Sequence, residues 1–105
     1  MRHPTTWPAQ LHPLVDAGEG ALTPDTSRTV EAFQLRADLL RAALAWTGGQ
    51  LDISRGTPAV LLPGAAGRIE LGDYAVRVGG VLHAEPAAGF WTRWWPAADI
   101  GADDG

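Results

Sequence analysis

Hydrophobic and polar residues follow a helical period over residues 24–46, the longest periodic segment of the chain. Thr23 and Pro24 at its start provide an N-cap hydroxyl and a proline that needs no donor in the first turn. Gly48 and Gly49 after its end supply a residue able to adopt positive φ where the helix stops. Because the start and stop signals agree, the pattern predicts one long helix over residues 24–46.

The predicted helix carries two apolar stripes, whereas an ordinary surface helix has one. At 100° per residue, the first stripe consists of Val30, Phe33, Ala37, Leu40 and Leu44. The second stripe lies nearly opposite and consists of Leu35, Leu39, Ala42 and Trp46. Two explanations stay open. Either both stripes are buried within one chain, between a sheet and the N-terminal segment, or one stripe contacts another chain, which is a second copy or a different protein.

Shorter alternating runs after the helix predict an antiparallel sheet. Gly79 and Gly80 join two such runs, which is the pattern of a β-hairpin with a two-residue loop. Gly72 marks a bulge or tight turn in front of the hairpin. The strands predicted before the loop cover residues 50–55, 59–62, 68–71 and 73–78. The predicted hairpin pairs are Val78 with Val81, Val76 with His83, and Tyr74 with Glu85.

Residues 1–22 contain three prolines and two glycines, which disfavour a long helix or a central strand. Apolar residues, Trp7 among them, recur through this segment, so we expect an extended arm that pins its side chains onto the helix or onto a neighbouring subunit. The predicted organisation is an arm (1–22), one α+β domain (23–98) and an acidic, flexible tail (99–105). The predicted fold is one long central helix packed on a small antiparallel sheet or partly closed barrel of about five strands.

Residues 90–95, with the sequence FWTRWW, hold three of the five tryptophans. In a strand, Trp91, Arg93 and Trp95 share one face, and the arginine can stack between the two indoles. This face either closes the core or forms an aromatic binding ridge, because tryptophan and arginine are enriched at interface hot spots. The predicted interaction surface therefore consists of Trp7, Leu35, Leu39, Trp46, Trp91, Arg93 and Trp95.

His83, with Glu85 to orient it and Tyr74 nearby, is the titratable cluster that most resembles a catalytic site. The alternative is a strand-end histidine bonded to the tyrosine or to the backbone. Neither a nucleophile nor a second carboxylate can be paired with His83 from the sequence. His3 and His12 lack the spacing of a metal site. We therefore expect no enzymatic activity, no metal and no cofactor.

Composition narrows the class of protein further. The 105 residues are enough for one domain, and the absence of cysteine excludes disulfides and thiolate chemistry. The net charge of −4 disfavours binding to a nucleic-acid backbone. All basic residues are arginine and asparagine is also missing, which indicates a GC-rich genome. Neither a signal-peptide pattern nor an apolar run of transmembrane length is present. We expect a soluble protein, either cytoplasmic or part of an assembled particle, that is not secreted through a cleaved signal peptide.

Surplus apolar surface in a small domain favours a non-enzymatic interaction or assembly protein. Such a protein is a small subunit of a larger complex, for example a phage virion component or an accessory or inhibitor protein, and its partner is itself or another subunit. One alternative is a ligand-binding module that holds a sugar, nucleobase or peptide on Trp91, Arg93 and Trp95. A second alternative is a small enzyme that uses His83.

Overall fold

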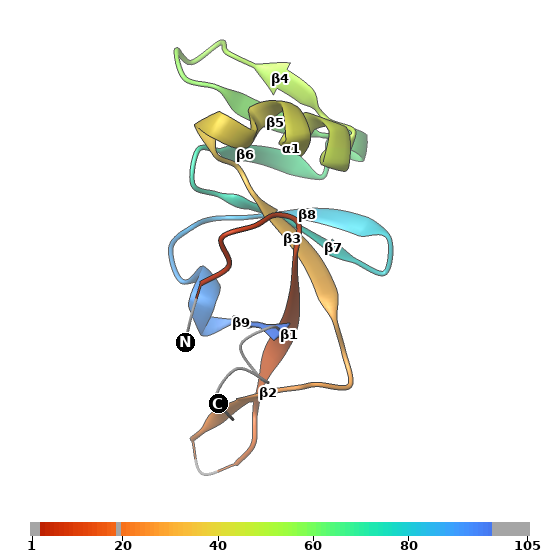
Figure 1. The fold of residues 1–105 in the computed structure, drawn as a ribbon, viewed down its shortest axis with the longest axis vertical. Coiled ribbons are helices and arrows are strands. Elements are labelled where there is room, and N and C mark those ends of the chain that lie inside the picture. Colours follow the sequence, from red (N-terminus) through yellow and green to blue (C-terminus); the bar gives the residue numbers. More distant parts are fainter. Residues whose placement is uncertain (1–2, 19, 98–105) are drawn as a thin grey trace.

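The computed structural model describes residues 3–18 and 20–97. The chain adopts a mainly-β α+β fold with one helical segment of 11 residues (37–47, a 3-10 turn continued by an α-helix), a six-stranded antiparallel sheet and a three-stranded sheet. The molecule measures 45 × 28 × 23 Å. Figure 1 shows the helix and the smaller sheet at one end of the molecule, and the larger sheet extending from the middle to the other end. Within the described residues neither sheet closes into a barrel.

The larger sheet has the strand order β2-β1-β3-β7-β8, and a sixth strand, β9, pairs with β1. Its strands are β1 (Ala9–Asp16), β2 (Leu22–Pro24), β3 (Val30–Gln34), β7 (Tyr74–Val78), β8 (Val81–Glu85) and β9 (Trp94–Pro96). The smaller sheet consists of β4 (Gln50–Asp52), β5 (Ala59–Leu62) and β6 (Gly67–Glu70), in that order. The helical elements are the 3-10 turn η1 (Ala37–Leu39), the helix α1 (Leu40–Thr47), and the 3-10 turns η2 (Pro63–Ala65) and η3 (Phe90–Thr92).

The prediction of a helix over residues 24–46 is wrong for its first half. β3 occupies Val30–Gln34, and helical structure begins at η1. Successive side chains of a strand point to opposite faces, so Phe33 lies on one face of the sheet and Ala32 on the other, and both are buried. Because both faces are covered, the apolar residues of β3 do not keep a period of two. Their spacing instead continues the spacing of the apolar residues in the helix, so the sequence pattern resembles that of one longer helix.

The predicted end of the helix is confirmed. Gly48 adopts a left-handed conformation (φ 69°), and its N–H donates to the carbonyl oxygen of Leu44 at 2.9 Å. Gly49 is needed for a different reason, which is close packing. A Cβ atom at Gly49 would lie 2.5 Å from the carbonyl oxygen of Leu61 and 2.7 Å from Val60 Cγ1. The missing side chain lets the end of the helix lie directly against β5.

The expected N-terminal arm is largely a strand of the sheet. β1 pairs with β3 through Ala9–Leu11 and with β2 through Leu14–Asp16, and it also pairs with β9. Pro13 is tolerated because it lies between the segments that pair with β3 and with β2, where β1 changes partner. Its carbonyl oxygen accepts a hydrogen bond from the Asp25 N–H at 2.8 Å. The predicted tail, residues 99–105, lies outside the described residues.

The predicted hairpin is confirmed together with its register. β7 and β8 pair Val78 with Val81, Val76 with His83 and Tyr74 with Glu85. Gly79 and Gly80 both have positive φ, as a tight two-residue turn requires. The strand predicted over residues 59–62 is confirmed with its bounds, and those over 50–55, 68–71 and 73–78 are confirmed as shorter or shifted strands.

Two hydrophobic cores lie on opposite faces of the β3–β7 pair. On one face, α1 and the smaller sheet bury Phe33 and Ala75. On the other face, β1 and the segment around Phe90 bury Ala32 and Val76. The upper core consists of Phe33, Leu35, Ala43, Val60, Leu62, Ile69 and Ala75. The lower core consists of Leu11, Val30, Ala32, Tyr74, Val76 and Phe90. In the part of the chain that the structure describes, no helix is long and apolar enough to span a membrane.

Leu11 tests whether β1 is integral to the fold. Its side chain is fully buried in the lower core, so Leu11→Ala should lower the free energy of unfolding by about 2–5 kcal/mol. The matched control is Gln10→Ala, an exposed neighbour on the same strand, which should change the free energy by less than about 0.5 kcal/mol. Urea unfolding followed by tryptophan fluorescence measures both values. Equal, small effects of the two substitutions would show that the N-terminal segment is a dispensable arm.

Candidate functional site

The seven residues predicted to form one interaction surface are distributed over both cores. Leu35 is fully buried in the upper core, where Leu39 and Trp46 pack at its margin. Trp7 contacts both cores, and Trp91 packs against the lower one. Arg93 directly follows the 3-10 turn η3, and Trp95 is the middle residue of β9. The structure therefore does not bring these residues together on one face.

Most of the tryptophans serve to cover the lower core. Tyr74 and Phe90 stack with their ring centroids 3.6 Å apart, and Trp91 meets both rings edge-on at 5.8 and 4.9 Å. Trp7 lies 5.8 Å from Tyr74, and the His3 ring stacks on Trp91 at 4.7 Å. Such aromatic pairs add to the free energy gained by burying their area. Trp91, one of the two rings predicted to form a binding ridge, thus contacts other rings and the lower core.

Residues 90–95 do not form the continuous strand expected from the sequence. A 3-10 turn, η3, precedes the short strand β9, and Gly89 enters the turn with positive φ. As a result Arg93 does not stack between two indoles. Its Nη2 and Nε atoms donate to Glu85 Oε1 at 2.9 and 3.2 Å, and Trp94 Nε1 donates to the same oxygen at 3.0 Å. The Glu85 carboxylate therefore ties this segment to β8.

Among the described residues, a cation–π contact forms instead between Arg77 and Trp46. The guanidinium carbon of Arg77 is 4.1 Å from the centroid of the Trp46 ring, and Arg77 Nη2 donates to the Trp46 carbonyl oxygen at 2.8 Å. Arg77 also pairs with Glu31 at 3.4 Å, across the β3–β7 ladder. These contacts fix the end of α1 on the larger sheet, which gives Trp46 a structural role.

The His83 cluster does not assemble into a proton-transfer site. His83 is exposed, whereas Glu85 accepts hydrogen bonds from Arg93 and Trp94, and Tyr74 is buried against Phe90. Among residues 3–18 and 20–97, no hydrogen bond joins His83 to either partner. His12 is buried, and its Nδ1 lies 2.7 Å from the Arg28 carbonyl oxygen. No group of three histidine or carboxylate side chains in the same residues is arranged to hold a metal ion.

Aliphatic side chains at one end of the smaller sheet are exposed, which the sequence analysis did not predict. Leu51 is opposite Val60, and Val60 is opposite Ile69, so the three side chains form one row on one face of the sheet. Val60 and Ile69 are buried in the upper core, but Leu51, on the edge strand β4, is 48% exposed. The apolar row thus continues beyond the surface that α1 and the larger sheet cover.

Two further aliphatic residues lie at the same end of the sheet. β4 and β6 both run antiparallel to β5 and therefore point the same way. Ile53 comes directly after β4 and is 66% exposed, and Leu71 comes directly after β6 and is 43% exposed. We call Leu51, Ile53 and Leu71 the sheet-end surface. The alternation of Leu51 and Ile53 signalled a strand, but only the position of β4 at an edge leaves these residues uncovered.

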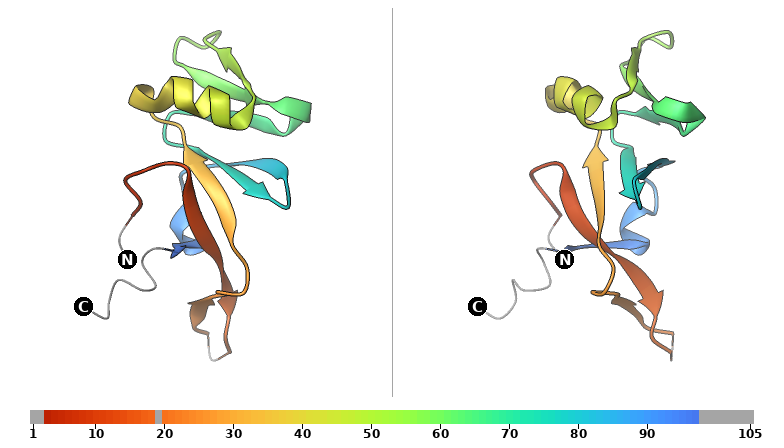
Figure 2. Two further views of the ribbon diagram at one scale, coloured as in Figure 1. Left: turned by 45° about the vertical axis from the view of Figure 1, so that its right-hand side comes forward. Right: turned by 90° about the vertical axis from the view of Figure 1, so that its right-hand side faces the viewer.

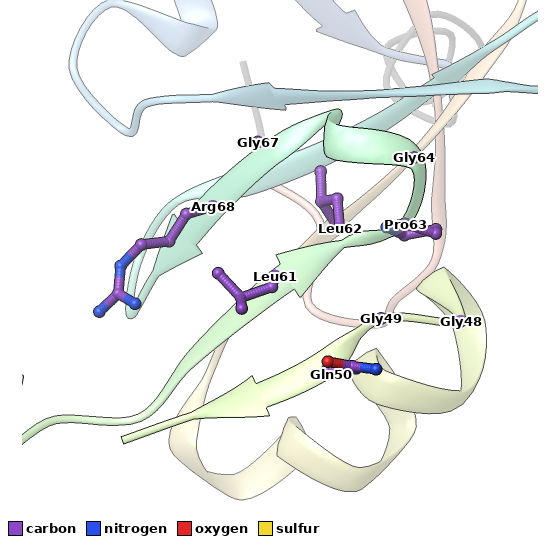
Figure 3. Close-up of a pocket in the computed structure, with 9 residues that line it drawn as sticks. All are labelled: Gly48, Gly49, Gln50, Leu61, Leu62, Pro63, Gly64, Gly67 and Arg68. Carbon is purple, nitrogen blue, oxygen red and sulfur yellow. The ribbon is translucent and has the colours of Figure 1, made fainter. Parts of the chain in front are cut away.

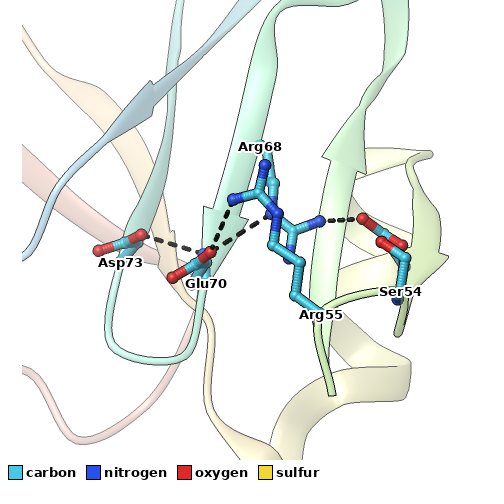
Figure 4. A network of polar contacts seen from close by, with 6 residues as sticks. Ser54, Arg55, Arg68, Glu70 and Asp73 are labelled. Atoms are coloured by element: carbon cyan, nitrogen blue, oxygen red, sulfur yellow. Dashed lines mark hydrogen bonds and ion pairs between the residues drawn. The ribbon is translucent and has the colours of Figure 1, made fainter. Parts of the chain in front are cut away.

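The opposite face of the smaller sheet carries a network of ion pairs (Figure 4). Arg68 donates to Asp52 across the sheet and pairs with Glu70 at 3.4 Å. Glu70 also pairs with Arg55 at 3.6 Å, and its backbone N–H donates to Asp73 Oδ2 at 3.0 Å. Asp52, the charged residue of edge strand β4, is therefore neutralised within the chain.

A shallow, open hollow of about 570 Å³ borders the same sheet. In Figure 3 the Arg68 side chain extends away from Gln50 and Pro63, so the polar groups do not converge on a common point. Ligand sites usually combine an enclosed apolar cavity with convergent polar groups. The lining residues are Gly48, Gly49, Gln50, Leu61, Leu62, Pro63, Gly64, Gly67 and Arg68.

Comparisons with models of protein families, with curated proteins and with solved structures found no match to this chain.

The pH dependence of the free energy of unfolding should show whether the Tyr74 phenol is buried in the lower core. Burial raises the pKa of its phenol above 10.0, although a hydrogen bond with Trp91 acts in the opposite direction. Since the unfolded chain loses the proton at a lower pH than the folded chain, the free energy of unfolding is unaffected below pH 10 and should fall as the pH rises above it. The chain has one tyrosine, no cysteine and no lysine, so few other groups titrate there.

Urea unfolding measured at intervals from about pH 9 to about pH 11.5 tests this expectation. Tyr74→Phe is the matched control, because it keeps the ring stacked on Phe90 and removes the ionisable group. The variant should show a flat profile where the parent declines. The same decline in both proteins would contradict the assignment.

Proposed function

We propose that the protein is a non-enzymatic protein–protein interaction module that binds its partner through the sheet-end surface. The observation that supports this most directly is the exposure of three aliphatic side chains, at 43–66%, at one end of the smaller sheet, in a domain whose tryptophans mostly pack against the two cores. Single exposed aliphatic residues are common on monomeric proteins, but several on one small sheet favour a surface that another molecule covers.

The location of part of the sheet-end surface also favours binding. β4 and the β4–β5 loop, which carry Leu51 and Ile53, lie at one end of an elongated molecule (Figure 1, Figure 2). The charges beside this surface are paired with one another, as in the contact of Arg55 with Glu70, so a partner need not neutralise them. Together these features fit a small subunit of a larger complex, of which a virion component or an accessory protein is an example.

The alternative of an aromatic ligand platform has less support. A stacking platform needs an accessible ring face. His3 stacks on Trp91, and Arg93 is engaged by Glu85 instead of flanking an indole. The alternative of an enzyme based on His83 lacks a hydrogen-bonded partner for that ring among the described residues.

Site-specific photo-crosslinking in the source cells tests the proposed surface. A photoreactive amino acid replaces Ile53 in one variant and Val81, at the tip of the β7–β8 hairpin, in the control. The two side chains are similarly exposed, at 66% and 57%, so their general reactivity should match. We expect a discrete protein adduct from position 53 and none from position 81.

Mass spectrometry of the adduct identifies the partner, which is a second copy or a different protein. Ile53→Asp should then weaken binding of the purified partner by about 10-fold or more, since it places a charge in an apolar contact. If position 53 gives no adduct, or if both positions give the same adducts, the proposed function is wrong.

A further inference from the structure

We propose that β4 pairs antiparallel with β4 of a second copy around a twofold axis at Leu51. The two three-stranded sheets would then join into one continuous six-stranded sheet. This inference rests on the proposed function, because it uses Leu51 and Ile53 of the sheet-end surface and names the molecule that covers them. Three observations support it: a strand edge without proline or an unpaired charge, complementary side chains along that edge, and an apolar row that stops there.

β4 is an edge strand, and one side of its backbone pairs with β5 while the other has no strand beside it in the described part of the chain. Exposed edges of natural sheets are protected by proline, by charged side chains, by a bulge or by the shortness of the strand. β4, with the sequence Gln50-Leu51-Asp52, is short but has no proline, and its one charged residue, Asp52, is paired with Arg68. By contrast, β2, at the edge of the larger sheet, ends on Pro24. The free edge of β4 is therefore open to another strand.

The side chains of β4 suit pairing with an identical strand. With Leu51 opposite Leu51 of the second copy, Gln50 comes opposite the second copy's Asp52, and the reverse pair forms by symmetry. The Gln50 amide can donate to that carboxylate, so the pairing places no like charges opposite each other. Because Arg68 already neutralises Asp52, the approach of two copies meets little repulsion.

The same register completes the apolar row. Within one chain the row runs from Ile69 through Val60 to Leu51, where it ends at the edge. Pairing at β4 would continue it into Leu51, Val60 and Ile69 of the second copy. Ile53 would come opposite the second copy's Gly49, which has no side chain to obstruct it. Three-residue strands bury little area, so we expect weak association, in the micromolar to millimolar range.

Sedimentation equilibrium of the purified chain from about 1 µM to about 1 mM measures the association. Gln50→Glu should weaken dimerisation about 2- to 30-fold, because it places two carboxylates opposite each other at both symmetric positions. Gln50→Arg should strengthen it, because the new guanidinium faces the second copy's Asp52. Gln50 is exposed, so neither change should disturb the fold. The control is Gln10→Glu, the same substitution at an exposed position on β1, which should leave the association constant unchanged.

A cysteine introduced at position 51 locates the twofold axis, since the natural chain has no cysteine. Directly opposed residues of antiparallel strands have Cβ atoms about 4.5–5.5 Å apart, near the distance that a disulfide spans. Leu51→Cys should therefore form a disulfide-linked dimer under mild oxidation, whereas Val81→Cys, on the hairpin tip, should not.

A monomer at every concentration would overturn this inference, as would association that Gln50→Glu and Gln50→Arg leave unchanged. If the purified chain is monomeric while the photoreactive group at position 53 captures a different protein, the self-pairing is wrong and the proposed function stands. If position 53 captures nothing and the chain is monomeric, both are wrong.

Discussion

The β3–β7 pair is the element on which the rest of the structure depends, because both of its faces are buried. Phe33 and Ala75 face α1 and the smaller sheet, and Ala32 and Val76 face β1 and the aromatic segment. Each face needs its own cover, and a chain of 105 residues must supply both. Burial of apolar area is the main favourable contribution to folding, so the few residues that cover each face must bury a large apolar area.

The two covers meet this constraint differently. On the lower face, large rings cover much area with few residues, as in the stack of Tyr74 on Phe90 with Trp91 against both. On the upper face, an 11-residue helical segment and three short strands cover the β3–β7 pair mainly with aliphatic side chains. α1 packs against β3 and β5, so the apolar row of the smaller sheet is covered at Val60 and left open at Leu51. The sheet-end surface is therefore exposed because the covering elements do not extend as far as Leu51.

The parts of the fold that depend on neighbouring residues could be predicted from the sequence, and those that depend on distant partners could not. The Gly79-Gly80 turn determines the register of β7 and β8 locally, and Gly48 determines where α1 ends. β3 was mistaken for helix because a strand buried on both faces loses its period of two. β1 was mistaken for an arm because its proline is tolerated only through a change of pairing partner, which the sequence does not show.

The candidate surface illustrates the same limit. Leu51 and Ile53 have the alternation of a strand with a buried face, and Leu51 does share its face with the core residues Val60 and Ile69. Whether such a side chain is covered depends on the position of its strand in the sheet, which is a property of the whole fold. In a monomer, an edge strand with an apolar row and no proline favours aggregation. In an assembly, the same edge can pair with a strand of another chain. The neutralisation of Asp52 by Arg68 favours the second case, because a charged edge is the ordinary protection against pairing and here that charge is satisfied within the chain.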